Sequence, residues 1–214
     1  MDYGLILPSL GDDATREGID AGGETAERLG FSDIWATDHL LVDASAAEDY
    51  GTIFEAVTTL AYLAGWTSRV RLGASVIVVP MRNAVVLAKE LATIDNLSRG
   101  RLIAGVGVGW SRPEFANVGV SDRFEVRGAY TEETIRLWRH LWSGANWPFH
   151  GRFHTFDDYV FGPLPEQGGA LPIWIGGRLE AALRRAGRVA DTYHASATNP
   201  AGLASRIPVI RAAA

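Results

Sequence analysis

Short runs of β-branched and apolar residues alternate along this chain with segments that have the apolar spacing of helices. The runs predict strands over residues 3–7, 33–35, 70–79, 102–106, 172–175 and 192–194. The intervening segments predict helices, most clearly over residues 54–64, 84–97 and 179–186. Strands separated by helices pair in parallel, so the alternation predicts an α/β fold whose sheet is covered on both faces. Such a sheet is either doubly wound or closed into a barrel.

About six strand-helix units can be counted, whereas a closed barrel of this type has eight. Residues 147–171 break the alternation with proline, glycine and aromatic residues. We interpret them as an insertion loop with a small hairpin at 153–156. The length of 214 residues and the hydrophobic content of 47% are typical of one globular domain, here spanning residues 1–214.

Two helix ends can be predicted from capping residues. Asp122 and Glu125 have the spacing of a capping box ahead of a helix that continues to about residue 141. Asn199 and the proline after it can begin a final helix, which Pro208 is expected to interrupt.

Composition excludes several classes of function. The formal charge is −5 and the 20 Lys and Arg residues are scattered, so nucleic acid is not an expected partner. No apolar run approaches the ~20 residues that cross a bilayer, and the first residues lack the positive flank of a secretory signal. We therefore expect a cytoplasmic protein without a membrane partner. The absence of cysteine excludes thiolate catalysis and cysteine zinc sites.

In parallel barrels the reacting groups lie on the loops that follow the strands. Asp38 and His39 follow the strand predicted at 33–35, where a histidine can donate a proton or hydrogen bond to a ring cofactor while a carboxylate tunes it. The alternative is that the pair only caps a loop. A third, weaker hypothesis is a divalent-metal hydrolase that uses Asp38, His39 and His194.

Two glycine-rich segments also follow predicted strands. Residues 105–109 lack the spacing of a dinucleotide-binding or P-loop motif. Their glycines either let the backbone approach a flat ring or form a bulge or turn. Residues 176–178 end a strand and open a helix, which suits an anion such as phosphate, or else a tight turn with a solvated Arg178.

Seven stretches taken together resemble the luciferase-like monooxygenase family, especially its coenzyme F-420-dependent branch. They are GFSDIWATDH at 30–39, RLGASV at 71–76, PMRN at 80–83, AKELATID at 88–95, LSRGRL at 97–102, GVGVGW at 105–110 and PIWIGG at 172–177. The stretches occur in the family's order and cover nearly the whole chain. The resemblance implies a TIM-type (β/α) barrel, incomplete at the C-terminus.

The resemblance also implies an oxidoreductase that uses coenzyme F-420, or FMN as in other branches, for hydride transfer or monooxygenation of a small organic substrate. Barrels of this kind often pair, which favours a homodimer. The implied catalytic residues are His39 and Asp38. The implied cofactor-binding residues are Ser75 and Val76, where the deazaflavin branch carries a non-prolyl cis peptide, and Gly107, Val108, Gly109, Gly176, Gly177 and Arg178. No metal ligand is implied.

The chain departs from the family pattern in two places. Several family enzymes place a glutamate directly after the glycine-rich strand as proton donor, whereas here that position is Trp110 and Glu114 comes later. The proton donor is therefore left open. The family's last two strand-helix units are absent, which motivates an alternative hypothesis of a truncated, non-catalytic cofactor-binding or assembly subunit. The substrate is not specified, because its contacts come from variable loops, chiefly 43–52 and 147–171.

Overall fold

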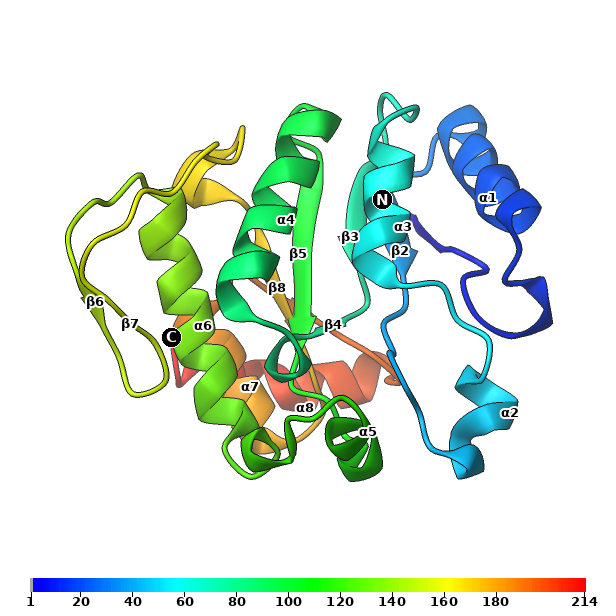
Figure 1. Ribbon diagram of the computed structural model, residues 1–214. Helices are drawn as coiled ribbons and strands as arrows, with labels where there is room; N and C mark the ends of the chain where they lie inside the picture. The colour runs from blue at the N-terminus through cyan, green and yellow to red at the C-terminus, as the bar shows by residue number, and fades with distance from the viewer. Residues whose placement is uncertain (1) are drawn as a thin grey trace.

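The computed structural model describes residues 2–214, and its core is a curved parallel sheet (Figure 1). The strands follow the order β1-β2-β3-β5-β8-β9, and a short strand, β4, pairs with β5. Their bounds are β1 Gly4–Ile6, β2 Asp33–Ala36, β3 Arg71–Ala74, β4 Ile77–Val78, β5 Leu102–Gly107, β8 Ile173–Gly176 and β9 Thr192–His194. Every pairing in this sheet is parallel, so the carboxyl ends of the strands share one edge.

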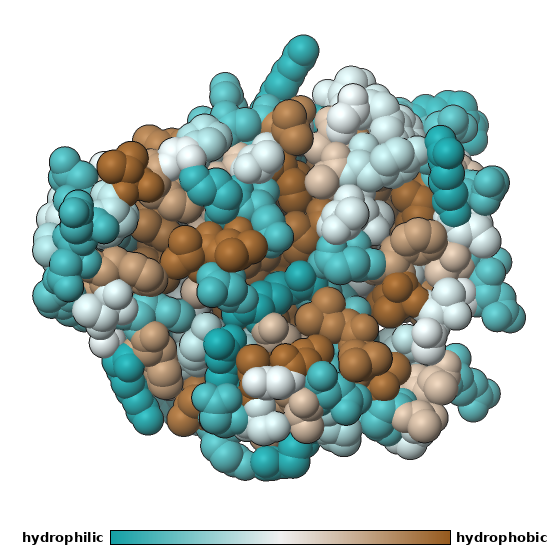
Figure 2. Space-filling view, in the orientation of Figure 1, coloured by the Kyte–Doolittle hydropathy of each residue, from teal (hydrophilic) through white to brown (hydrophobic). Residues whose placement is uncertain are grey.

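Helices between the strands cover the sheet. Figure 1 shows α3, α4 and α6 lying along one face of it, and α7 packs next to α6. The bounds are α1 Arg16–Leu29, α2 Ala47–Tyr50, α3 Ala56–Ala64, α4 Ala84–Ser98, α5 Arg112–Asn117, α6 Arg127–Trp142, α7 Glu180–Val189 and α8 Pro200–Arg211. In Figure 2 polar side chains cover much of this surface while apolar side chains show between the helices, as expected for amphipathic helices whose apolar stripes face inward.

The α4–α6 pair shows how the sequence fixes this packing. Asn83 caps α4 by accepting hydrogen bonds from the backbone N–H groups of Val85 and Val86. Trp138 and Trp142 lie one turn apart on α6, and their indole N–H groups donate to the carbonyls of Ala84 and Ala88, also one turn apart on α4. Both indoles are fully buried. Each therefore fills the core and also gives its N–H group a hydrogen-bond partner on the neighbouring helix.

Inside the curved sheet, Trp35 of β2 fills space that glycines on neighbouring strands leave open. A Cβ atom added at Gly73 of β3 would lie 2.4 Å from the Trp35 ring, and one at Gly4 of β1 would lie 2.6 Å from it. Trp174 of β8 and His194 of β9 pack against the same ring. The interior is therefore a packed core, as in parallel barrels.

The predicted fold class is confirmed, and the barrel is incomplete. Among residues 2–214, β1 and β9 form the two ends of the sheet and do not pair with each other. The strand predicted over 70–79 divides into β3 and β4 at Ser75 and Val76. Residues 147–171 contain an antiparallel hairpin of β6 Phe149–His150 and β7 Thr155–Phe156, wider than the hairpin predicted.

Two of the predicted helix ends are wrong. Helix α6 begins at Arg127 with no side-chain cap, and Glu125 instead pairs with Arg112, so Asp122 and Glu125 form no capping box. Asn199 caps α8 as predicted, but the helix continues through Pro208 to Arg211. Of the residues described, no helix is long and apolar enough to span a membrane.

Candidate active site

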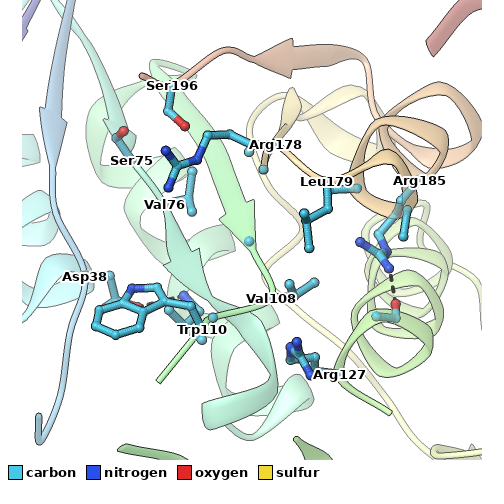
Figure 3. A pocket seen from close by; sticks show the side chains of 18 of the residues that line it. Asp38, Ser75, Val76, Val108, Trp110, Arg127, Arg178, Leu179, Arg185 and Ser196 are labelled. Carbon is cyan, nitrogen blue, oxygen red and sulfur yellow. Dashed lines mark hydrogen bonds between the residues drawn. The ribbon is translucent and has the colours of Figure 1, made fainter. Parts of the chain in front are cut away.

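A cavity of about 840 Å³ opens at the carboxyl edge of the sheet (Figure 3). It is lined by residues from loops that are far apart in the sequence, following β2, β3, β5, β8 and β9. The ten residues that the resemblance assigns to catalysis or cofactor binding all lie on its wall: Asp38, His39, Ser75, Val76, Gly107, Val108, Gly109, Gly176, Gly177 and Arg178. A volume of this size is typical of small-molecule and cofactor sites.

The glycine-rich end of β5 makes room for the segment that joins β3 to β4. A Cβ at Gly107 would lie 2.5 Å from the Val76 side chain, and one at Gly176 of β8 would lie 3.0 Å from it. A Cβ at Gly105 would meet the Ala74 carbonyl, and one at Gly109 would meet Val78. Every second residue from Gly105 to Gly109 thus lies opposite every second residue from Ala74 to Val78. The Val76 side chain lies directly over Gly107 and Gly176. The Ser75–Val76 peptide is cis, as the resemblance implied.

His39 is held by a buried carboxylate from a distant helix. Its Nδ1 lies 2.9 Å from Oε2 of Glu114 on α5, whose Oε1 accepts from the backbone N–H of Leu40 at 2.7 Å. Burial raises the pKa of Glu114, but the bonds from His39 and Leu40 outweigh burial, so its pKa lies below the ordinary value of 4.5. An ionised carboxylate can only accept, so Nδ1 of His39 carries the proton and donates it. This leaves Nε2 as the ring atom that can accept a proton.

Two aromatic rings flank His39. The ring of Tyr50, from α2, lies 4.3 Å from the imidazole between centroids, and Trp110 meets it edge-on at 5.8 Å. Trp110 is 59% exposed and lines the cavity, so it stands at the cavity's rim. The position where several family enzymes have a glutamate therefore holds an aromatic wall, while the carboxylate nearest His39 comes from Glu114.

Asp38 has structural partners for both of its oxygens. Oδ2 accepts from the backbone N–H of Val78 at 2.8 Å, and Oδ1 accepts from Arg82 at 2.6 Å. Burial raises the pKa of Asp38, and Arg82 together with the Val78 N–H opposes that rise. Arg82 also pairs with Glu55 at 2.7 Å. These bonds tie the loop after β2 to β4, which forms part of the cavity floor.

The opposite side of the cavity is rich in positive charge. Gly177 and Arg178 connect β8 to α7, and Leu179, at the start of α7, supplies no side-chain cap for the first N–H groups of the helix. Arg127 and Arg185 line the same cavity. Uncapped helix N–H groups and guanidinium groups both favour an anionic ligand at this side.

The proposed metal-ligand group of Asp38, His39 and His194 is not brought together. Nε2 of His194 lies 2.8 Å from the Ser75 hydroxyl, and its ring packs on Trp35 rather than on the other two residues. Burial lowers the pKa of His194. In residues 2–214 no cluster of three or more potential ligands for a metal ion is found.

Known proteins resemble this chain in sequence and in fold. The family model described as luciferase-like monooxygenase matches residues 12–214. The chain belongs to the luciferase-like monooxygenase family. Among the family's named proteins, it is 33% identical to an FMNH(2)-dependent dimethylsulfone monooxygenase of Pseudomonas fluorescens (strain Pf0-1), over 99% of this chain and 57% of that protein. It is 34% identical to an F420-dependent glucose-6-phosphate dehydrogenase of Kineococcus radiotolerans, over 78% of this chain and 49% of that protein.

Solved structures show the same family architecture. Monooxygenase RslO1 from Streptomyces bottropensis superposes with a TM-score of 0.82 at 25% identity, over 100% of this chain and 65% of that one. The coenzyme F420-dependent tetrahydromethanopterin reductase from Methanopyrus kandleri gives a TM-score of 0.81 at 22% identity, over 99% of this chain and 61% of that one. The chain spans about half the length of the curated relatives it matches.

Glu114 is a site residue that the sequence left without a role, as it did Tyr50, Arg127 and Arg185. It lies 75 residues after His39, and no local pattern links the two. One signal was present: Ser111 and Glu114 have the spacing of a capping box, and the Ser111 hydroxyl accepts from the Glu114 N–H at 3.3 Å. The Glu114 side chain does not complete that box, because it reaches across to the loop after β2.

Proposed function

We propose that this chain forms the cofactor-binding part of an oxidoreductase that uses a flavin or deazaflavin to act on a small organic substrate by hydride transfer or monooxygenation. The observation that carries the proposal is that His39, Val76, Val108 and Arg178 come from four loops and line one cavity. When bound, the cofactor supplies the redox chemistry, while the protein supplies position and electrostatics.

The residues present fit such a cofactor. Val76, Val108 and Leu179 offer apolar surface for a planar ring, and Gly177 with Arg178 offers N–H groups and charge for an anionic tail. We propose coenzyme F-420 as the cofactor, on the strength of the likeness to the deazaflavin branch, with FMN as the alternative. Relatives of comparable identity are named for each of the two.

We assign His39 the task of holding or moving a proton at the substrate through Nε2, with Glu114 fixing the tautomer. Trp110 and Tyr50 flank the imidazole and limit the access of water to it. Asp38 then acts as a positioning residue that ties the loop to β4. General acid or base catalysis by a positioned histidine contributes roughly 10²- to 10⁴-fold to a rate.

Parallel spectroscopic titrations with coenzyme F-420 and FMN test the cofactor, and we expect the tighter binding for coenzyme F-420. His39→Ala tests the chemistry, and it should lower turnover by about 10²-fold or more while changing cofactor affinity much less. His150→Ala is the matched control, because His150 is an exposed histidine on the hairpin that pairs with Asp157. Unchanged turnover in His39→Ala, or an equal loss of turnover and affinity, contradicts the role of His39.

A second candidate function is that of a non-catalytic cofactor-binding or assembly subunit, which the open sheet ends at β1 and β9 favour. Analytical ultracentrifugation combined with a cofactor-reduction assay separates the two. A monomer with steady turnover removes the subunit hypothesis. The pairing of two copies, the single-domain organisation and the cytoplasmic location also stay predictions.

A further inference from the structure

The turn between β8 and α7 is held in place by a side chain from the neighbouring strand. Tyr193 lies in β9, opposite Ile175 of β8. Its hydroxyl group donates a hydrogen bond of 2.8 Å to the carbonyl of Gly177, the first residue after β8. The proposed chemistry gives Tyr193 no task, and its side chain is not among those that line the cavity. Any effect of this tyrosine on a ligand therefore acts through the turn.

The direction of this hydrogen bond is fixed by Arg206. Helix α8, which carries Arg206, packs against α7 (Figure 1). Nη1 of Arg206 lies 3.0 Å from the Tyr193 hydroxyl oxygen and 3.3 Å from the Ser196 carbonyl oxygen. A guanidinium group can only donate and a carbonyl can only accept, so the Tyr193 oxygen accepts from Arg206 and its hydrogen points to Gly177. Donation from a charged group polarises the hydroxyl and strengthens the hydrogen bond that it donates in turn.

Gly177 needs an outside contact, because a glycine by itself does not hold one backbone conformation. Its φ is +136°, and a Cβ at this position would lie 2.6 Å from the Cβ of Ala182 in α7. The carbonyl of Gly177 and the N–H of Arg178 belong to one planar trans peptide, so they point in opposite directions. Tyr193 therefore sets the direction of the Arg178 N–H by fixing this carbonyl. Arg178 itself lies on the cavity wall (Figure 3).

We propose that Tyr193, held by Arg206, is a positioning residue that orients the Gly177–Arg178 peptide to bind the phosphate group of the cofactor. The inference rests on the proposed function, which assigns this turn to the cofactor's anionic tail. Neither side chain touches the ligand, and both act by keeping one backbone N–H group pointed at it. A donor that is already oriented binds an anion more tightly than one that must first be ordered.

The affinities for FMN and for riboflavin, which lacks the phosphate, test this role. Tyr193→Phe keeps the ring and removes only the hydroxyl group. We expect calorimetric titration to show FMN binding weakened about two- to tenfold, as for the loss of one hydrogen bond, and riboflavin binding unchanged. Tyr62→Phe is the matched control, because the Tyr62 hydroxyl donates to Asp20 of α1, away from the cavity. Unchanged FMN affinity in Tyr193→Phe, or an equal loss of affinity for both flavins, overturns the proposal.

Variants of Arg206 test whether the tyrosine acts alone. Arg206→Leu removes the donor to the Tyr193 hydroxyl, and we expect it to weaken FMN binding and to leave riboflavin binding unchanged. Arg206→Lys keeps a charged donor and should bind FMN more tightly than Arg206→Leu. Because Arg206 acts through Tyr193, the double variant Tyr193→Phe/Arg206→Leu should lose no more FMN affinity than Tyr193→Phe alone. Additive losses, or wild-type FMN affinity in Arg206→Leu, overturn the assignment of Arg206.

The two proposals fail in distinguishable ways. If neither flavin nor coenzyme F-420 binds to the wild type, the proposed function fails, and hydrogen exchange in the ligand-free chain still decides the positioning role. The N–H of Ala182 is bonded to the Leu179 carbonyl at 2.8 Å in the first turn of α7, so a loosened turn exposes it. We expect Tyr193→Phe to lower its protection about two- to tenfold and Tyr62→Phe to leave it unchanged. Unchanged protection in Tyr193→Phe overturns the proposal. Equal wild-type affinity for FMN and riboflavin also overturns it, because the turn then holds no phosphate.

Discussion

Glu114 of α5 holds His39 of the loop after β2 through a 2.9 Å hydrogen bond to Nδ1, although 75 residues separate them in sequence. The bond fixes which imidazole nitrogen carries the proton, so the two side chains act as one unit. Trp110, which occupies the position of a glutamate in several family enzymes, packs against the outer side of this unit.

Replacing Glu114 tests the unit. Glu114→Gln can still bond to His39 but no longer enforces one tautomer, so we expect turnover to fall about tenfold or more while the Kd for the cofactor changes less. Steady-state kinetics and a cofactor titration measure the two quantities. Glu17→Gln, on α1 away from the cavity, is the control and should leave both unchanged. A cofactor affinity that drops as far as turnover would show that Glu114 only supports the fold.

The lowered pKa of Glu114 also predicts how stability depends on pH. A carboxyl whose pKa is lower in the folded state than its ordinary value of 4.5 stabilises the fold above that value, and the contribution is lost as the pH falls through the folded-state pKa. The free energy of unfolding should therefore decrease below about pH 4.5. Urea unfolding of the wild type and Glu114→Gln across this range measures the difference. Parallel curves for the two proteins would be inconsistent with this linkage.

Asp38 should matter more for stability than for chemistry. Its side chain is 1% exposed and pairs with Arg82, so Asp38→Asn leaves a buried guanidinium with only Glu55 as its counter-ion. We expect the free energy of unfolding to decrease by about 3 kcal/mol. Asp157→Asn instead weakens an exposed hydrogen bond to His150, and it should change the free energy of unfolding by less than about 0.5 kcal/mol. Chemical denaturation of both variants measures these changes in the free energy of unfolding. If Asp38→Asn is as stable as the wild type but has greatly reduced turnover, Asp38 has a catalytic role instead.

The contact between Val76 and Gly107 can be tested by a double-mutant cycle. Gly107→Ala places a methyl group 2.5 Å from the Val76 side chain and should destabilise the chain by about 1–3 kcal/mol. Val76→Ala removes the obstructing methyl groups, so the double variant should be destabilised less than the sum of the single variants. Denaturant unfolding of all four proteins gives the coupling. Additive effects would show that Gly107 is required for another reason.

Much of the fold follows from local sequence. The strand at 102–106 and the helix at 84–97 were predicted within a residue or two of β5 and α4, because both are buried apolar segments with a clear period and clear stops. The strand pattern over 70–79 did not show the division into β3 and β4, because apolar residues continue on both sides of Ser75; only the resemblance marked Ser75 and Val76 as an irregular place in the backbone. The continuation of α8 through Pro208 was also missed. Proline usually interrupts a helix, but here the helix continues past it.

The site was predictable only in part. The parallel sheet brings strand ends to one edge, so the loops at 38–39, 75–76, 107–109 and 176–178 could be expected to meet there. Arg127 and Arg185 could not be found in this way, since they lie on helices and reach the cavity through the packing of α6 against α7. The role of Glu114 could not be predicted either, because its partner His39 is brought to it only by the tertiary structure.

The close contact of residues 74–78 with the glycines in and just after β5 also bears on how such a protein could be redesigned. Three successive contacts, at Gly105, Gly107 and Gly109, leave little freedom for a new side chain in the floor beneath the ligand. A search for variants with altered ligand selectivity would gain most from randomising Trp110, which is 59% exposed at the cavity rim, and should leave the glycines untouched.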